Sequence, residues 1–441
     1  MKSQIEICPN CFFAPYRGGR CPKCGYTATE QTENSIALSP GTVLNERYLV
    51  GRLLGLGGFG VTYLALDTTT QTKIAIKEYF PSSLAVREAD RTICFNGKGD
   101  SRIYDHGMKA FIREAKSLSK FIGQKNIVQV SHSFFENGTG YFVMEYLNGV
   151  NLKVLRKGMG GKIPFSLAYE ILLTLVGTLE YIHKEGLLHR DISPENIFMT
   201  GSGEVKIIDF GATRYYIGEE SRSLAIVLKP GFAPPEQYSS KGEQGPWTDV
   251  YALATTFYQS VSDIRVPEAP DRLAGKSIEP LFNLVPEVNE KLSAVIEKAM
   301  ALDHKKRFQS MEEFQNAILK CGQSGEERVV SKLEAAGTPY ISVDSGSLKG
   351  EKWAIPSGAD IRIGRQPSAN HIVISDVQVS REHCVIRYDQ KNGIFFLKDI
   401  STNGTFSERG DRFDKGEDVV LAPGASFCLA KDRLLIRLGL E

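Results

Sequence analysis

The stretch that decides the fold is His189-Arg190-Asp191-Ile192-Ser193-Pro194-Glu195-Asn196, which is followed by Asp209-Phe210-Gly211. Carboxylate and amide oxygens are the ligands that Mg²⁺ prefers in proteins, and Mn²⁺ shares this preference. Asn196 and Asp209 are therefore candidate ligands for one of these ions. Asp191 is the candidate group that accepts or orients the proton of an attacking hydroxyl. Together the two motifs predict phosphoryl-transfer chemistry, in which positioning and counter-charge supply most of the catalysis.

A glycine-rich turn lies well before these motifs. Gly55–Val61 has the pattern G-x-G-x-x-G-x-V and lies between two predicted strands, residues 48–54 and 61–65, so its backbone is expected to fold over phosphates as a flap. The same glycine spacing also opens dinucleotide-binding units, which makes it unspecific by itself. Ile74-Ala75-Ile76-Lys77 follows on a third predicted strand, residues 73–77, and would place the Lys77 ammonium opposite the α- and β-phosphates.

Five motifs in this order identify a family. The fifth, Ala233-Pro234-Pro235-Glu236, matches the sequence A-P-E with one additional proline. Residues 47–320 resemble a bacterial Hanks-type serine/threonine protein kinase. The resemblance implies an α+β bilobal fold with an N-terminal lobe over 47–147 and a C-terminal lobe over 148–320. After about residue 150 the apolar periodicity becomes helical, and it predicts helices over 164–184, 289–301 and 311–319.

The resemblance also implies the substrates and the residues that bind them. ATP would donate its γ-phosphoryl group to serine or threonine hydroxyls of proteins. The residues implied around the nucleotide, with 145–147 as the hinge, are Leu54, Gly55, Gly57, Gly58, Gly60, Val61, Ala75, Lys77, Met144, Glu145 and Leu147.

The family holds the strand lysine, here Lys77, with a glutamate from a helix of the N-terminal lobe. Glu114 is our choice, because its neighbours give that segment an inward apolar face. Glu78 and Glu88 are competitors, but Glu78 lies next to the lysine on the strand and Glu88 lies near a break rich in proline and serine. The stretch from Glu78 to Ala110 is predicted to be an insertion ahead of the helix that bears Glu114.

Two further residues match structural positions of the family. Asp249 corresponds to the aspartate that ties a buried helix to the catalytic loop. Arg307 corresponds to the arginine that pairs with the glutamate of the A-P-E element, here Glu236.

The sequence departs from the family at two positions. Ser193 stands where serine/threonine-specific members usually carry lysine, and Lys229 lies near the end of the activation segment, where they usually carry threonine. We hypothesise that Lys229 supplies the missing cation; an exposed loop lysine is the alternative. Serine/threonine specificity remains the preferred assignment because no tyrosine-kinase signature replaces the lysine. Phosphorylation of the activation segment could dock on Arg190, and the candidate sites are Ser221, Ser223, Thr213, Tyr215 and Tyr216.

Four of the eight cysteines form two C-x-x-C pairs near the start of the chain, Cys8 with Cys11 and Cys21 with Cys24. Four thiolates at this spacing suit a tetrahedral structural Zn²⁺. A segment of this size cannot bury enough core to fold unaided, so the metal is expected to stabilise it. The segment resembles a zinc ribbon, and a redox pair is the alternative. A structural or docking role is predicted; a nucleic-acid role is a weaker option, suggested by Arg17, Arg20 and Lys23.

The C-terminal region alternates valine and isoleucine between turn sequences, which predicts an all-β unit of about 100 residues. Ile361–Arg365, Val379–Ile386 and Asp399–Phe406 follow one another and resemble the motifs of a forkhead-associated (FHA) domain. The resemblance implies a β-sandwich whose loops bind phosphothreonine. The residues that it implies at the phosphopeptide are Arg365, Ser380, Arg381, Thr402 and Asn403. His383 is expected to brace these loops.

Composition narrows the class of protein further. The 441 residues are 42% hydrophobic and 24% charged, as in globular domains. A net charge of +1 gives no whole-chain electrostatic reason to bind nucleic acid. The uninterrupted apolar runs are shorter than the roughly 20 residues of a membrane helix, and residues 1–6 lack the apolar core of a secretory signal. We therefore expect a cytoplasmic protein with reduced thiols and no membrane segment.

The predicted organisation is a zinc ribbon over 1–27, a linker over 28–46, the kinase domain over 47–320, a second linker over 321–338 and the FHA domain over 339–441. The predicted function is a serine/threonine protein kinase whose FHA domain binds phosphothreonine partners or its own phosphosites, which would allow self-association. The alternative is a pseudokinase scaffold that binds nucleotide and recruits phosphoproteins. The intact set of catalytic residue types argues against that alternative, namely Lys77, Asp191, Asn196 and Asp209.

Overall fold

A computed structural model gives the fold. It describes residues 7–13, 21, 36–97, 101–200, 203–210, 228–239, 241–322, 338–346, 348–356, 358–390, 393–407, 412–413, 415–421, 423–430 and 434–440. The chain divides into two units, one with residues 1–147 and 210–227 and one with residues 148–209 and 228–441, and each is described by itself. Cys24, Gly211 and all five candidate phosphorylation sites lie outside the described residues.

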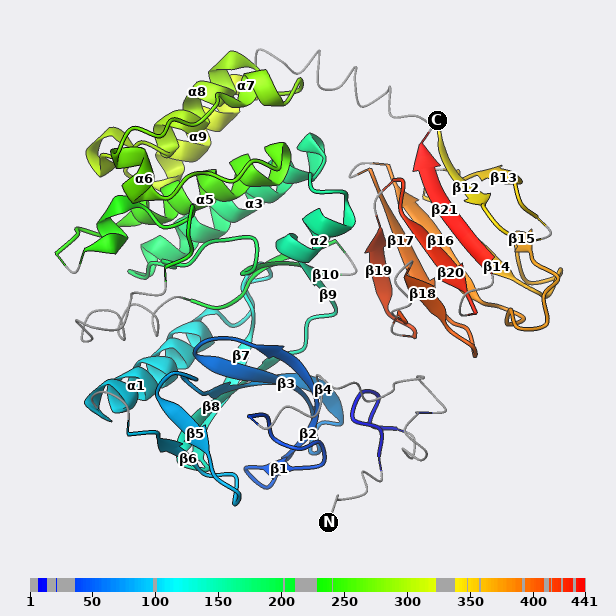
Figure 1. The fold of residues 1–441 in the computed structure, drawn as a ribbon, viewed down its shortest axis with the longest axis horizontal. Coiled ribbons are helices and arrows are strands. Elements are labelled where there is room, and N and C mark those ends of the chain that lie inside the picture. Colours follow the sequence, from blue (N-terminus) through cyan, green and yellow to red (C-terminus); the bar gives the residue numbers. More distant parts are fainter. Residues whose placement is uncertain are drawn as a thin grey trace. The chain divides into compact units, whose positions relative to one another are not determined.

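The first unit is built on a six-stranded antiparallel sheet with the order β1-β2-β3-β4-β8-β7 (Figure 1). Its strands are β1 (Val43–Leu44), β2 (Tyr48–Leu56), β3 (Gly60–Asp67), β4 (Thr72–Tyr79), β7 (Val130–Glu136) and β8 (Thr139–Glu145). The three predicted strands are confirmed as β2, β3 and β4. Helix α1 (Ser101–Leu118) packs on β7 and β8 and continues into the short 3₁₀ helix η2 (Ser119–Phe121).

Two parts of this unit differ from the sequence-based expectation. The helix that bears Glu114 begins at Ser101, because buried residues continue at helical spacing through the end of the presumed insertion. The remainder of that stretch contains a small hairpin of β5 (Ala85–Arg87) and β6 (Ile93–Phe95). The segment predicted as a linker is also partly ordered, because β1 pairs with β2 and the buried Leu38 donates its N–H to the Tyr63 hydroxyl at 3.0 Å.

The helical part of the second unit also contains a small sheet of β9 (Gly149–Asn151), β10 (Ile197–Thr200) and β11 (Val205–Ile207). Its helices are α2 (Leu152–Gly158), α3 (Phe165–Lys184), η3 (Pro235–Tyr238), α5 (Pro246–Ser262), α6 (Ala269–Leu273), α7 (Leu281–Leu284), α8 (Glu290–Ala299), η4 (His304–Lys306) and α9 (Met311–Gly322). The three predicted helices are confirmed as α3, α8 and α9. Helix α5 is buried along almost its whole length and packs on α3, α8 and α9, so it is the core of this lobe (Figure 1).

Helix α3 is longer and more apolar than the uninterrupted apolar runs of the sequence suggest. By length and composition it could cross a membrane, but half of the apolar window is buried inside the folded chain. Its buried residues face α5 and α9, as expected for the core helix of a packed domain.

The C-terminal part of the second unit is an all-β sandwich, as predicted (Figure 1). One sheet has the order β13-β12-β21-β20-β18 and the other the order β15-β14-β16-β17-β19. Their apolar residues form one shared core. The strands are β12 (Pro339–Val343), β13 (Lys352–Ala354), β14 (Asp360–Gly364), β15 (Ile372–Val373), β16 (Cys384–Asp389), β17 (Ile394–Asp399), β18 (Thr405–Ser407), β19 (Asp418–Leu421), β20 (Ser426–Leu429) and β21 (Leu434–Leu440).

Candidate active site and phosphopeptide site

A buried carboxylate on α5 holds the predicted catalytic loop. Asp249 is fully buried, and its two oxygens accept the N–H groups of His189 at 2.8 Å and of Arg190 at 2.7 Å. His183 on α3 is a further partner, with its Nε2 2.8 Å from Asp249 Oδ2. Burial raises the pKa of Asp249, but the His183 side chain and the loop donors lower it, and the net pKa lies below its ordinary value. The predicted tie between helix and loop is confirmed, and His183 is a partner that the sequence analysis missed.

The backbone of the loop is locally constrained. Arg190 and Asp209 both have positive φ, 66° and 55°, a conformation that is rare for residues with a side chain. The buried His189 ring accepts the Asp191 N–H at its Nδ1, 3.2 Å away, and burial lowers the pKa of this histidine. The surrounding structure therefore maintains a loop conformation that a free chain would rarely adopt.

The two predicted metal ligands lie on neighbouring segments of the second unit. β10 and β11 pair directly, and the Ile208 N–H donates to the Asn196 carbonyl at 2.9 Å, next to Asp209. The Asn196 side-chain amide donates to the Asp191 carbonyl at 2.8 Å and to Asp191 Oδ2 at 2.7 Å. These bonds occupy the amide nitrogen and not the amide oxygen, which is the atom that a hard cation needs. The donor set therefore fits Mg²⁺.

Lys229 lies in the same polar cluster as the residue whose charge it was hypothesised to replace. Its Nζ donates to Ser193 Oγ at 2.7 Å and lies 3.5 Å from Asp191 Oδ2 and 3.3 Å from Glu195 Oε2. Only 14% of the Lys229 side chain is exposed, which contradicts the alternative of an exposed loop lysine. Burial raises the pKa of Glu195, but Lys153 and Lys229 lower it to below its usual range.

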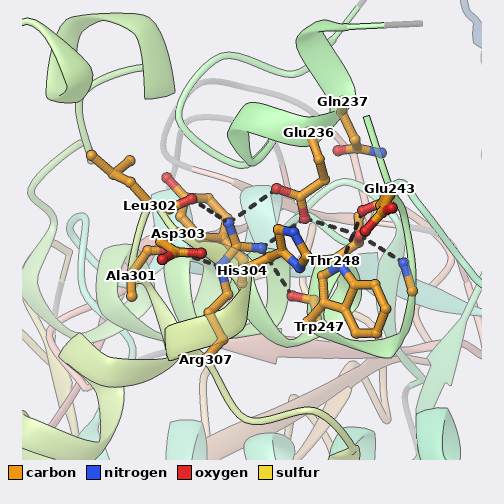
Figure 2. Close-up of polar contacts among 12 residues, drawn as sticks. Glu236, Gln237, Glu243, Trp247, Thr248, Ala301, Leu302, Asp303, His304 and Arg307 are labelled. Atoms are coloured by element: carbon orange, nitrogen blue, oxygen red, sulfur yellow. Dashed lines mark hydrogen bonds and ion pairs between the residues drawn. The ribbon is translucent and has the colours of Figure 1, made fainter. Parts of the chain in front are cut away.

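The glutamate of the A-P-E element forms the predicted ion pair. Glu236 Oε1 and Oε2 lie 2.7 and 3.0 Å from the two terminal nitrogens of Arg307, and both side chains are almost completely buried (Figure 2). Thr248 donates to the same carboxylate at 3.0 Å. The next residue, Gln237, donates to the Arg190 carbonyl at 2.8 Å. Gln237 was not singled out by the sequence, and it links this element to the catalytic loop.

The residues predicted around the nucleotide lie in the first unit, on β2, β3, β4 and β8, except that Gly57 and Gly58 lie in the turn between β2 and β3 and Leu147 follows β8. Ala75 and Met144 are cross-strand partners, and Lys77 is opposite Phe142, with its Nζ 5.7 Å from the ring centroid. The glycine-rich turn is closed by a bond from the Gly57 N–H to the Gly60 carbonyl at 2.9 Å. Val61 and Ala75 are buried, and Leu54 is half-buried. In the expected hinge, the Glu145 N–H already donates to the Gln129 carbonyl at 2.9 Å.

The structure separates the three candidate glutamates. Glu114 is buried on the inward face of α1, and Glu88 is exposed on the small hairpin. Glu78 is fully buried and accepts hydrogen bonds from Arg87, Tyr63 at 2.7 Å and Tyr141. Glu78 is therefore already committed to a separate network.

The predicted phosphopeptide residues come together at one edge of the sandwich. The Arg365 N–H donates to the Ser380 carbonyl at 2.9 Å, and the Thr402 N–H donates to Ser380 Oγ at 2.8 Å. Asn403 is oriented by a 2.7 Å bond from its side-chain amide to the Gln378 carbonyl. Arg381 is exposed beside them. Exposed cationic and hydroxyl groups in one loop cluster suit an anion such as a phosphate.

His383 braces these loops from below, as predicted. It is fully buried, its Nδ1 accepts the Ser380 N–H at 3.0 Å, and its Nε2 lies 3.1 Å from the Gly404 carbonyl. This pairing requires a neutral ring that donates through Nε2, and burial lowers the pKa of His383. Arg412, which no motif indicated, lies 3.4 Å from the Thr402 carbonyl.

The first cysteine pair forms a tight turn, residues 7–13, which we call the cysteine turn. The Phe12 N–H donates to the Cys8 carbonyl at 2.9 Å, and the Asn10 N–H donates to Cys8 Sγ at 3.5 Å. The sulfurs of Cys8, Cys11 and Cys21 lie within 4.8 Å of one another, and those of Cys11 and Cys21 are 3.7 Å apart. A tetrahedral zinc site with Zn–S bonds of about 2.3 Å has sulfur–sulfur edges of about 3.8 Å. The sulfurs described therefore fit Zn²⁺.

Comparison with known proteins identifies two domain families in the chain. The family model of the protein kinase domain matches residues 48–318, and that of the FHA domain matches residues 361–430. The chain therefore belongs to the protein kinase family, and it also contains an FHA domain.

Its relatives include serine/threonine kinases of bacteria and CBL-interacting protein kinases of plants. Serine/threonine-protein kinase D of Synechocystis is 31% identical over 293 residues, which are 64% of this chain and 54% of that protein. The probable serine/threonine-protein kinase SCO3848 of Streptomyces coelicolor is 30% identical over 63% of this chain and 40% of that protein. The chain thus spans about half the length of the curated relatives that it matches.

Solved structures show the same fold. The structure described as PpkA-294 in its apo form is 34% identical, with a TM-score of 0.59 over 64% of this chain and all of that chain. The kinase domain of Mycobacterium tuberculosis PknI has a TM-score of 0.50 at 23% identity, which supports the fold alone.

Proposed function

We propose that this protein is an ATP-dependent serine/threonine protein kinase whose FHA domain binds phosphothreonine. The observation that supports it best is the cluster that Lys229 forms with Asp191, Ser193 and Asn196, which lie on a loop held by a buried carboxylate. In this proposal Asp191 receives the hydroxyl proton, and Asn196 and Asp209 hold Mg²⁺ or Mn²⁺, which offsets phosphate charge when bound. Lys77, positioned by Glu114, binds the α- and β-phosphates.

Lys229 is proposed to replace the family lysine. It reaches the catalytic aspartate from the activation segment instead of from the catalytic loop, and Ser193 Oγ fixes its ammonium. A positive charge beside the attacking oxygen and the γ-phosphate would stabilise the transition state more than the ground state.

The matched experiment returns the lysine from position 229 to position 193, where the family usually carries it. Lys229→Ala should lower kcat by about 10²-fold, since loss of one preorganised electrostatic contact typically has this effect. The double variant Ser193→Lys with Lys229→Ala should recover a substantial part of the rate, because it restores the usual position of the charge. Lys276→Ala changes an exposed lysine of the same lobe and is the control. Full activity of Lys229→Ala would contradict the role of this residue.

Catalysis itself is tested by transfer of radiolabel from ATP. Label on wild-type protein but not on Asp191→Ala would support a kinase, and mass spectrometry of the product would show whether serine, threonine or tyrosine is modified. No label in either protein, combined with nucleotide binding, would favour the pseudokinase scaffold.

The FHA function rests on the cluster formed by Arg365, Ser380, Arg381, Thr402 and Asn403. Arg365 and Ser380 are proposed to bind the phosphate and Asn403 the peptide backbone. A phosphothreonine peptide should bind the full chain, and its unphosphorylated form should not. Arg365→Ala should abolish this difference without unfolding the sandwich, because the Arg365 side chain is exposed.

The cysteine turn is proposed to hold a structural Zn²⁺ through Cys8 and Cys11, together with Cys21 and Cys24 from the second pair. Metal analysis of the purified protein should give one zinc per chain, and Cys11→Ser should lose it. We further propose that the protein acts in the cytoplasm on protein substrates, and that its FHA domain recruits phosphorylated partners or a second copy of the chain.

A further inference from the structure

The cysteine turn lies against the strand that leads into the glycine-rich loop. The Arg52 N–H on β2 donates to the Pro9 carbonyl at 2.9 Å, and Arg52 Nε donates to Asn10 Oδ1 at 2.7 Å. These bonds connect the turn to both the backbone and a side chain of β2. The turn and the strand belong to the same unit of the structure.

The approach between the turn and the strand is close enough to require glycine. A methyl group on Gly51 would lie 2.3 Å from the Pro9 carbonyl oxygen and 2.5 Å from the Phe12 ring. Neither distance is compatible with normal packing. The absence of a side chain at position 51 therefore allows the turn to sit directly on β2.

Phe12 joins the turn to two regions that the kinase resemblance implies around the nucleotide. It is buried in one apolar cluster with Leu64 and Leu66, and the half-buried Leu54 and Tyr146 pack against the same cluster. Leu54 immediately precedes the first glycine of the glycine-rich loop, and Tyr146 lies in the expected hinge. A shift of the Phe12 ring would therefore disturb both regions.

The turn itself is too small to maintain its shape without help. Phe12 has a positive φ of 59°, and its N–H closes the turn on Cys8. The sulfurs of Cys8 and Cys11 in the turn and of Cys21 outside it converge beside it. Small cysteine-rich elements of this kind depend on their metal for folding, so loss of the metal would release Phe12 and Pro9 from β2.

From these contacts we infer that metal binding by the cysteine turn controls nucleotide affinity. With Zn²⁺ bound, the turn holds β2, Leu54 and Tyr146 in the arrangement that binds ATP. Without it, the glycine-rich loop and hinge lose this support and bind nucleotide more weakly. This inference rests on the proposed function, because it takes Leu54 and the hinge, which the kinase resemblance implies around the nucleotide, as part of the ATP site.

The experiment measures the dissociation constant of a fluorescent ATP analogue for the full chain in excess Mg²⁺. It compares zinc-loaded protein, protein stripped with a zinc-selective chelator that is then removed, and stripped protein with zinc restored. Stripping should weaken binding about fivefold or more, the range typical of coupling between two sites, and zinc should restore it. Hydrogen exchange supplies a second readout, since the Arg52 amide should lose protection when Pro9 leaves.

Two variants test the contact without touching a cysteine. Phe12→Ala removes the shared apolar anchor, and Arg52→Ala removes the bond to Asn10; both should retain zinc and weaken nucleotide binding. Phe13→Ala is the matched control, because this neighbouring phenylalanine is 66% exposed. Thermal unfolding of each variant identifies any general loss of folding.

The outcomes separate this inference from the proposed function. Equal nucleotide affinity with and without zinc, or an Arg52 amide that stays protected after stripping, would overturn the control by metal and leave the kinase proposal intact. Zinc-loaded wild-type protein that binds no nucleotide would overturn both.

Discussion

The catalytic loop of the kinase domain and the ligand loops of the FHA domain are both held by one fully buried side chain, but the two side chains differ in charge. Asp249 is a carboxylate that accepts hydrogen bonds from two successive backbone N–H groups and is paired with the His183 ring. His383 is a neutral imidazole that accepts one N–H from Ser380 and is paired with the Gly404 carbonyl.

The difference follows from what each loop requires. A carboxylate only accepts hydrogen bonds, so it can gather several donors from one loop and fix a strained conformation there. An imidazole has one donor and one acceptor, so it can link two separate loops, one through an N–H and the other through a carbonyl. The kinase loop is therefore anchored to a helix, whereas the two FHA loops are anchored to each other.

Removing Asp249, the charged side chain that holds the catalytic loop, should have the largest effect on stability. Asp249→Ala leaves the donors of His189, Arg190 and His183 without their acceptor in the lobe core. We expect a loss of about 3–5 kcal/mol in the free energy of unfolding, measured by chemical denaturation, together with loss of phosphoryl transfer. Asp271→Ala is the control, since its ion pair with Lys276 is exposed and should change stability by less than about 1 kcal/mol. If Asp249→Ala changed stability as little as Asp271→Ala, the contrast between Asp249 and His383 would disappear.

The Glu236–Arg307 pair tests whether buried charge in this lobe is costly to leave unpaired. Arg307→Leu should lower stability by about 3 kcal/mol or more because Glu236 stays buried without its partner. The double variant Glu236→Leu with Arg307→Leu should be less destabilised than the single variant. If the double variant lost as much as the two single variants added together, the pair would not behave as a coupled unit.

Removing His383, the neutral side chain that holds the FHA loops, should have a smaller effect on stability. His383→Ala abolishes two hydrogen bonds without leaving an ionised group, so we expect a loss of about 2–3 kcal/mol for the sandwich. Phosphopeptide affinity should fall with it, because Ser380 and Gly404 no longer share a support. Asn403→Ala, which changes an exposed side chain, should weaken phosphopeptide binding without lowering the stability of the sandwich. Unchanged peptide affinity in His383→Ala would show that the loops hold their arrangement without it.

The smallest expected effect is a pH dependence of stability caused by His383. Burial lowers the pKa of His383 below its unfolded value of about 6.5, although Asp399 and the Gly404 carbonyl raise it. The unfolded chain then binds more protons, so stability falls as the pH decreases from about 6.5 towards the folded pKa. Asp249 shows the corresponding loss only below about pH 4.

His383→Gln is the variant that isolates this effect, because its amide offers one hydrogen-bond donor and one acceptor but does not titrate. Denaturation of the full chain between pH 7 and pH 5 should show a steeper loss for wild type than for this variant. His189 is also buried with a lowered pKa, but it is the same in both proteins and cancels in the difference. Parallel curves would exclude His383 as the titrating group.

Much of the site could be predicted because its chemistry is local in the chain. Asp191 and Asn196 lie within one short loop, and the motif alone predicted their candidate roles, whereas Ser193 stood out as a departure from it. The helix bearing Glu114 was predicted too short, because the polar residues and Gly107 at its start obscure the apolar face that continues to Ser101. His183 and Gln237 were missed because their partners lie on distant elements: His183 contacts Asp249 on α5, and Gln237 contacts Arg190 in the catalytic loop.

By itself the sequence determined the two domain families and the order of the catalytic motifs, since these depend on residue types at short spacings. Only the tertiary structure decided that Lys229 reaches Ser193 across 36 positions and that Arg52 binds the cysteine turn across 42. Contacts of this kind depend on the packing of distant elements, which no local spacing specifies. For the same reason, folding placed Glu78 in its own buried network and left Glu114 on the inward face of α1.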